Sequence, residues 1–328
     1  MERRATQNLR TSGQRIMQIA KFDDMVEAAC RVGPVPIAVA AAHDPEVLKA
    51  IERAQREGMV EATLVGDWPA MEAYAAQIGA AGSPEVGQIL SRAHIVHEPD
   101  PQRAAAIVVS LARRGQAAVV VKGQIKTADL LGLALNRHVG IRGRGLLTHV
   151  AIFELPGMER LIYLSDSGVV VYPDVYQKLE IINNVVAVAR LFGVERPKVA
   201  ILAASETVSP KIPASIDALA LSKMAEQGWV KQAMVDGPLG LELAISPRAA
   251  ELSEVDSPIA GLADVLIVPN VEAGNIVAKG LLYFAQARMA GLVVGAQVPI
   301  VISSRADTAE TRYLSLAMAA VLSRSDAI

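Results

Sequence analysis

Residues 268–311 read VPNVEAGNIVAKGLLYFAQARMAGLVVGAQVPIVISSRADTAET, and in this stretch apolar runs alternate with turns and helix-forming segments. One apolar run ends at Asn270, and the run PIVISSR ends at Arg305. Apolar residues at helical spacing lie between the two runs and again after the second. This alternation is typical of a sheet whose parallel strands are connected by helices.

The rest of the chain repeats the pattern. Most of its apolar runs are unbroken, which indicates strands buried on both faces, as in parallel sheets covered by helices. We predict strands within residues 36–44, 61–67, 93–98, 117–123, 161–167, 198–204, 232–238, 264–270 and 299–305. We predict helices at residues 45–57, 101–114, 127–137, 174–192, 214–227, 274–290 and 307–322. The chain is therefore expected to be an α/β protein with mostly parallel sheets.

A segment rich in glycine and arginine, RHVGIRGRGLLTH at 137–149, interrupts this pattern. Its composition is typical of a loop or hinge. A chain of 328 residues is also long enough for two domains. We therefore expect a first α/β domain over residues 1–150 and a second one over residues 151–305.

Composition and charge exclude several classes of protein. Hydrophobic residues make up 52% of the chain and charged residues 20%, which excludes a disordered chain. The formal net charge of -2 gives no signal for a nucleic-acid partner. The longest uncharged stretch, residues 289–304, has 16 residues, fewer than the roughly 20 that a membrane helix needs. We therefore expect neither a nucleic acid nor a membrane as a partner.

Two features predict a cytoplasmic protein. Cys30 is the single cysteine, so no intrachain disulfide can form, which fits a reducing compartment. The first 22 residues are basic and lack the apolar core of a secretory signal.

The common cofactor and nucleophile motifs are absent from the sequence. No GxGxxG follows an apolar run, and neither GxSxG nor GxxxxGK with a following serine or threonine occurs. His94 and His97 would point to opposite faces of a strand, so the spacing of a metal site is absent too. We therefore expect neither a metal nor a redox cofactor.

Polar residues gather where the predicted strands end, and open α/β sheets bind their ligands at this edge. Asn270 ends one apolar run. Asn275 and Lys279 follow near the start of the next predicted helix, where exposed N–H groups favour an anion. Ser304 and Arg305 end another run. Together these residue types predict a site for an anionic small molecule.

Each of these residues also has an ordinary structural explanation. Asp307 and Glu310 fit a capping box, in which Asp307 accepts from the first turn of the helix and Glu310 reaches back. Lys279 fits a solvated surface lysine, Arg305 a surface ion pair and Asn275 a helix cap. Only their recurrence at several strand ends favours a site.

The recurrence extends upstream. VVVKGQIKTADLL (119–131) places a polar turn with Lys122 and Thr127 between a strand and a helix, although Thr127 also fits a cap. Thr148 and His149 lie beside a third apolar run. The candidate substrate-binding residues are therefore Lys122, Thr127, Thr148, His149, Asn270, Asn275 and Lys279.

Six segments of the sequence resemble the phosphate acetyl/butyryltransferase family. They are KGQIKTADLL (122–131), LLTHVAIFELPG (146–157), YPDVYQKLEIINN (172–184), VDGPLGLELA (235–244), VPNVEAGN (268–275) and VVGAQVPIVISSRADTAET (293–311). The resemblance is strong over about residues 115–322 and is closer to the phosphate butyryltransferase arm of the family.

The resemblance implies a fold and an activity. Two α/β domains would flank a cleft, similar to the isocitrate/isopropylmalate dehydrogenase architecture, in a homodimer. The C-terminal helix, about residues 306–328, would pack back on the first domain. The implied activity moves a short-chain acyl group between CoA and inorganic phosphate, with CoA as a substrate and no other cofactor.

The resemblance also assigns catalytic residues. In the acetyltransferase arm a Ser-Arg pair and an acidic residue seven positions after the serine are functional, and Ser304 and Arg305 match the pair. The acidic position falls on Thr311, so Asp307 and Glu310 are the nearest candidate bases, with Asp307 preferred.

Two more positions depart from the family pattern STADLLR or TTADVLR. Lys126 stands where a serine or threonine is usual, and Gly132 stands where an arginine is usual. Together with Thr311, these departures leave an alternative function open, that of a protein that binds CoA or acyl phosphate without catalysis. A metal-dependent decarboxylating dehydrogenase of similar fold is the other alternative, although the aspartate cluster and the dinucleotide fingerprint that it needs are missing.

The mechanism that we expect from the resemblance is direct attack of the CoA thiol on the acyl phosphate, without a covalent enzyme intermediate. A carboxylate would deprotonate the CoA thiol, whose pKa resembles that of cysteine at about 8.5. The thiolate would then attack the carbonyl carbon of the acyl phosphate. We expect Arg305 to bind phosphate through its planar fork and Ser304 to donate to the developing charge. Helix N-termini near residues 127, 275 and 307 would add N–H donors.

Overall fold

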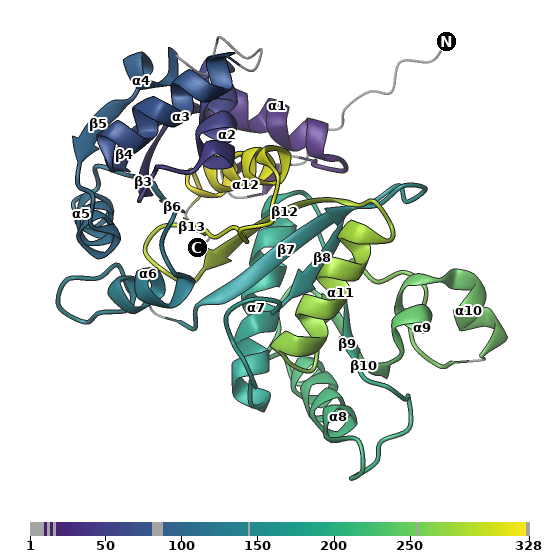
Figure 1. The fold of residues 1–328 in the computed structure, drawn as a ribbon. Coiled ribbons are helices and arrows are strands. Elements are labelled where there is room, and N and C mark those ends of the chain that lie inside the picture. Colours follow the sequence, from purple (N-terminus) through teal and green to yellow (C-terminus); the bar gives the residue numbers. More distant parts are fainter. Residues whose placement is uncertain are drawn as a thin grey trace, which may run out of the picture.

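The computed structural model describes residues 10–11, 14–15, 18–80, 88–143, 145–253 and 255–325, which form a mixed α/β structure (Figure 1). Its strands are β1 (Arg10–Thr11), β2 (Gln14–Arg15), β3 (Val35–Ala40), β4 (Val60–Gly66), β5 (His94–His97), β6 (Val119–Lys122), β7 (Thr148–Glu154), β8 (Ile162–Ser165), β9 (Lys198–Leu202), β10 (Met234–Leu239), β11 (Val265–Ile267), β12 (Arg288–Val294) and β13 (Ile300–Val301). Its helices are α1 (Phe22–Val32), α2 (Pro45–Arg56), α3 (Trp68–Ala80), α4 (Ile89–Arg92), α5 (Pro101–Arg113), α6 (Thr127–Ala134), α7 (Val175–Leu191), α8 (Pro213–Glu226), α9 (Leu241–Ile245), α10 (Pro247–Leu252), α11 (Val271–Tyr283) and α12 (Ala309–Leu322). Among the helices in these ranges, none combines the length and the apolar character that a bilayer crossing requires.

One large sheet runs through the molecule. Within the described residues it has eleven strands in the order β10-β9-β11-β8-β7-β12-β13-β6-β3-β4-β5. Neighbouring strands are parallel except in the middle, where β7 runs antiparallel to β8, and β12 runs antiparallel to both β7 and β13. The prediction of an α/β protein with a mostly parallel sheet is therefore confirmed, and the antiparallel strands at its centre are the difference.

All the predicted strands are present, and each overlaps its predicted run. The prediction missed β7 and β12, which pair with each other from Thr148 and Val294 to Glu154 and Arg288. The helix predicted over 274–290 ends at Tyr283 instead, and its last residues belong to β12. The reason is that an unbroken apolar run looks the same whether it forms a buried strand or the end of a buried helix.

The two faces of the sheet are covered differently. One face carries a continuous apolar core under α1, α2, α12, α7 and α8. The other face carries two separate cores, one under α5 and α6 and one under α9 and α11. On β12 the division falls between Val293, which belongs to the first of these cores, and Met289, which belongs to the second.

The C-terminal helix lies far from its neighbours in sequence. Figure 1 shows α12, in yellow, beside α1 and α2, and it also packs on β12. The predicted domain boundary near residue 150 lies inside β7, and β13 pairs with β6 from the first half of the chain. The sheet thus continues across the boundary, and the division into two domains stays a prediction.

Candidate active site

Two cavities lie along the loop that connects β13 to α12. The first, here called the charged cavity, has about 830 Å³ and is lined by Asp44, Asp100, Pro101, Gln102, Lys122, Gly123, Gln124, Ile125, Lys126, Asp129, Arg305 and Arg312. The second, here called the small cavity, has about 240 Å³ and is lined by Thr127, His149, Ser167, Gly168, Val169, Asn275, Ala278, Lys279, Met289, Ile302, Ser303, Ser304 and Asp307. Eight of the eleven predicted site residues line one cavity or the other.

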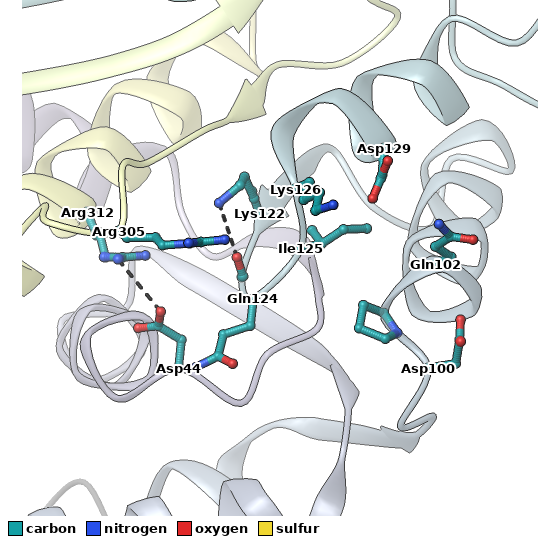
Figure 2. A pocket seen from close by; sticks show the side chains of 12 residues that line it. Asp44, Asp100, Gln102, Lys122, Gln124, Ile125, Lys126, Asp129, Arg305 and Arg312 are labelled. Carbon is teal, nitrogen blue, oxygen red and sulfur yellow. Dashed lines mark hydrogen bonds and ion pairs between the residues drawn. The ribbon is translucent and has the colours of Figure 1, made fainter.

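Cations gather on one side of the charged cavity. Figure 2 shows Arg312, Arg305 and Lys122 in a row there. Lys122 is buried, and its Nζ donates to the carbonyl oxygens of Gly123 at 3.3 Å and Ser303 at 3.4 Å. Burial lowers the pKa of Lys122, and the charges of Arg312 and Arg305 act in the same direction. Arg305 is exposed, and within the described part of the chain its side chain has no hydrogen bond or ion pair, so its guanidinium is available to an anion.

Arg312 in α12 holds the loop in place. Its side chain is 5% exposed. It donates to the carbonyl oxygens of Asp307 (3.3 Å) and Ser304 (3.2 Å) and to Ser303 Oγ (2.7 Å). Its Nη2 also lies 3.7 Å from Asp44 Oδ2. Arg312 was not among the predicted site residues, although an arginine before the apolar part of a helix, from Tyr313 onward, was a usable signal.

Helix α11 provides one wall of the small cavity. Asn275, Ala278 and Lys279 face it together because positions three and four apart share one face of a helix. Asn270, rather than Asn275, caps this helix, and its Oδ1 accepts from the Ala273 N–H at 3.0 Å. Asn270 itself lines neither cavity.

The glycine in the AGN sequence of α11 allows a close approach. A Cβ at Gly274 would lie 2.6 Å from the carbonyl oxygen of Asp166, in the turn that follows β8. Glycine therefore lets α11 rest on this turn. The contact brings the helix wall and the turn to the same cavity.

His149 of β7 and Ser167 line the small cavity from the sheet side. The imidazole is 8% exposed, and its Nδ1 lies 3.0 Å from Ser167 Oγ. Asp166 organises the turn, since its carboxylate accepts from the backbone N–H groups of His149, Gly168 and Val169 at 2.8 Å each. Burial lowers the pKa of His149. Asp166 and Ser167 were not predicted, and the polar end of the predicted strand at 161–167 was the signal for them.

Thr148 and His149 point to opposite faces of β7, because side chains alternate along a strand. Thr148 is fully buried on the far face, where its Oγ1 accepts from Asn184 Nδ2 of α7 at 2.8 Å. Of these two predicted binding residues, the structure therefore brings His149 alone to a cavity.

Thr127 lies at the first position of α6, where its side chain lines the small cavity. The cap of this helix is Lys126, which makes no side-chain cap bond. The alternative interpretation of Thr127 as a helix cap is therefore wrong. Lys126 itself lines the charged cavity.

Asp307 closes the loop that carries Ser304. Its buried Oδ2 accepts from the Ser304 N–H at 2.7 Å, and its Oδ1 lies 3.4 Å from Lys279 Nζ. Thr308 caps α12 by accepting from the Thr311 N–H at 3.3 Å. The expected capping box of Asp307 and Glu310 is therefore wrong, because the helix begins one residue later.

Glu310 lines neither cavity. Its carboxylate accepts from Arg53 Nη1 at 2.6 Å and from Arg288 Nη2 at 3.1 Å. Of the two predicted carboxylate bases, Asp307 is thus the one beside a cavity. In the described ranges, no three side chains of His, Cys, Asp or Glu are grouped as a metal site requires.

The comparisons with known proteins agree on one family. The family model described as phosphate acetyl/butaryl transferase matches residues 69–320. Phosphate butyryltransferase of Clostridium acetobutylicum is 40% identical over 93% of this chain and 98% of its own length. Phosphate acetyltransferase of Thermotoga maritima is 38% identical over 92% of this chain and 99% of its own length. The crystal structure of a branched-chain phosphotransacylase from Enterococcus faecalis matches with a TM-score of 0.76 and 30% identity, covering 88% of this chain and 99% of that one.

Proposed function

The chain belongs to the phosphate acetyl/butaryl transferase family, and we propose that it transfers a short-chain acyl group between CoA and inorganic phosphate. In this reaction acyl-CoA and phosphate give acyl phosphate and CoA. The observation that carries the proposal is the Ser304–Arg305 pair, which presents a hydroxyl to the small cavity and a free guanidinium to the charged cavity.

The charged cavity is suited to phosphate. A guanidinium forms two parallel charge-assisted hydrogen bonds to a phosphate group, and Arg305 has no competing partner among the described residues. Lys126 replaces the serine or threonine that is usual in the family and lines the same cavity. We assign the phosphate to this cavity, with Lys122 and Lys126 adding positive charge.

The small cavity is suited to a short acyl chain. Val169, Ala278, Met289 and Ile302 give it an apolar part. A cavity of about 240 Å³ accommodates a short acyl group.

The chemistry that follows is direct attack in a ternary complex of enzyme, CoA and acyl phosphate. The thiolate attacks the carbonyl carbon, and negative charge develops on the carbonyl oxygen and on the departing phosphate. Ser304 and Lys279 lie in the small cavity to stabilise the first charge, and Arg305 lies in the charged cavity to stabilise the second. Acyl transfer changes no oxidation state, so CoA, as a substrate, is the only coenzyme that the reaction requires.

The same proposal includes two lobes around the site. Residues 1–150 with α12 would form one lobe and residues 151–305 the other, in the manner of the isocitrate/isopropylmalate dehydrogenases. The division of the apolar core between α6 and α11, on the face that holds the small cavity, supports this arrangement. A ligand at such a division contacts both lobes.

We also propose that the enzyme acts as a homodimer in the cytoplasm. Ile276, Tyr283 and Phe284 leave apolar surface exposed along α11, and Phe284 is 92% exposed. A second copy of the chain would cover this surface. Sedimentation equilibrium measures the mass, and a monomer at micromolar concentration would contradict the dimer. Cys30 as the single cysteine supports the reducing compartment.

The function is tested by mixing the purified protein with CoA and either acetyl phosphate or butyryl phosphate. The free thiol and the released phosphate are followed together, and we expect the two to change in equal amounts. Calorimetric binding of CoA without turnover of either acyl phosphate would instead support the non-catalytic binding protein.

A further inference from the structure

The proposed reaction requires a proton acceptor in the small cavity. A thiol of pKa about 8.5 is mostly protonated at neutral pH, and only its thiolate attacks efficiently. Two residues that line the cavity can accept a proton, Asp307 and His149. The choice between them follows from the partners that each already has.

Asp307 is occupied on both oxygens. Its Oδ2 accepts from the Ser304 N–H and its Oδ1 faces Lys279. Protonating this carboxylate would weaken both interactions and release the loop that carries Ser304.

His149 has one nitrogen held and the other free. Nδ1 is bonded to Ser167 Oγ, whereas Nε2 has no hydrogen-bond partner in the described part of the chain. Glycines make room for the ring: a Cβ at Gly291 would lie 3.1 Å from Nε2, and one at Gly168 would lie 3.3 Å from Cγ. The imidazole therefore lies against the sheet with Nε2 unpartnered at the cavity.

The surroundings keep this imidazole neutral. Burial is the largest effect and lowers the pKa of His149, and the Lys279 charge on α11 acts in the same direction. Asp166 after β8 and Asp307 before α12 oppose it. From β12, Gly291 lies against the ring and Met289 lines the same cavity, and neither residue carries a charge. A neutral imidazole at pH 7 is ready to accept a proton.

We propose that His149 Nε2 takes the proton from the CoA thiol and delivers it to the departing phosphate; this inference rests on the proposed function. The S–H bond breaks and its electron pair forms the new S–C bond at the carbonyl carbon. The C–O bond to phosphate then breaks, and its pair stays on the phosphate oxygen, which receives the proton from the imidazolium. Acyl phosphate dianion and thiol thus give thioester and hydrogen phosphate dianion, with no net proton released.

Ser167 acts as a positioning residue in this scheme. Nε2 can act as a base only when the ring proton is on Nδ1. In that tautomer Ser167 Oγ accepts a hydrogen bond from Nδ1–H. Asp166 holds the turn on which Ser167 lies by accepting from the N–H groups of Gly168 and Val169. Asp307 keeps the separate task of fixing the Ser304 loop.

The test compares His149→Asn with Asp307→Asn in the thioester-forming direction. Asparagine retains a group near the position of Nδ1 to bond Ser167 but has nothing at Nε2. We expect kcat of His149→Asn to fall roughly 10²–10⁴-fold, with the melting temperature and the KM for acyl phosphate little changed. For Asp307→Asn we expect a higher KM and a lower melting temperature, because it loosens the loop.

The pH profile provides the second readout. Wild-type kcat/KM should fall below the pKa of His149 and stay level above it, and since burial lowers that pKa the plateau includes pH 7. Without the base only preformed thiolate reacts, so kcat/KM of His149→Asn should rise about tenfold per pH unit up to about pH 8.5. Ser167→Ala should move the acid limb to lower pH, because the imidazolium loses an acceptor.

Three outcomes would overturn the inference. One is a His149→Asn enzyme that keeps more than about a tenth of wild-type kcat. Another is a His149→Asn enzyme whose kcat/KM depends on pH in the same way as that of the wild type. The third, which also decides the matter if His149→Asn does not fold, is a Ser167→Ala enzyme with an unmoved acid limb. A wild-type protein that turns over neither acyl phosphate would instead contradict the proposed function itself.

Discussion

The charged cavity and the small cavity adjoin the same loop, yet they hold their polar groups in opposite ways. Arg305 reaches the charged cavity exposed and without a partner among the described residues, beside the buried ammonium of Lys122. In the small cavity His149 and Asp307 are both buried and both hydrogen-bonded. A doubly charged, solvated phosphate is met by the free guanidinium of Arg305, whereas a carbonyl and a thiol need groups fixed in advance, since fixed groups require no reorganisation during the reaction.

Apart from loss of the proposed base, the largest effect is expected when the charged cavity loses its free guanidinium. Arg305→Ala should lower kcat/KM roughly 10²–10³-fold, the range for removal of one group that stabilises transition-state charge. Steady-state kinetics with acyl phosphate and CoA measure it. Arg103→Ala is a matched control, because Arg103 lies on α5 outside both cavities and pairs with Glu98. An Arg305→Ala enzyme as fast as that control would remove Arg305 from the site.

A bulkier side chain in the small cavity should change the preference for acyl chain length and leave phosphate binding unchanged. Ala278→Leu fills part of the apolar wall and should lower the ratio of butyryl to acetyl turnover about 10–200-fold, the range for one methylene in a tight pocket. The two acyl phosphates are compared on the same enzyme sample. Equal losses for both would place the acyl chain outside this cavity.

Removing Arg312, which holds the loop shared by the two cavities, should lower the stability of the protein. Arg312→Leu leaves the Ser303 hydroxyl and the carbonyl oxygen of Asp307 without the donor that they have in the wild type, while the carbonyl oxygen of Ser304 keeps only the N–H of Asp307. The free energy of unfolding should fall by about 1–3 kcal/mol, the cost of unsatisfied buried polar groups. Urea denaturation measures it, and Arg312→Lys, which keeps the charge without the fork, should lose less. If Arg312→Leu were as stable as the wild type, the loop would not depend on the hydrogen bonds of Arg312.

The smallest effect is expected at Glu310, outside both cavities. Its partners Arg53 and Arg288 are partly exposed, so Glu310→Gln should cost at most about 1 kcal/mol of stability. We expect kcat to change less than about twofold, because the carboxylate touches neither cavity. A hundredfold loss in this variant would make Glu310 the base and would end the contrast between the two cavities.

Much of the site was predictable because polar residues at strand ends have a strong local signature. Ser304, Asn275 and Lys279 were found in this way, and the structure places all three around the small cavity. Arg312 and Ser167 were missed for different reasons. An arginine within a helix resembles a solvated charge until the helix proves to be buried, and Ser167 matters only through its bond to an imidazole 18 positions earlier.

Neighbours along the chain were sufficient to locate most strands of the large sheet, more than half of the described helices and the polar turns, because hydrophobic period and capping chemistry act over a few residues. Which strand neighbours which, and which face of β7 meets the cavity, depended on pairing between segments more than a hundred residues apart. The small cavity exists because two apolar cores fail to meet across β7 and β12. Such a gap is a property of packing in three dimensions, and no short stretch of residues encodes it.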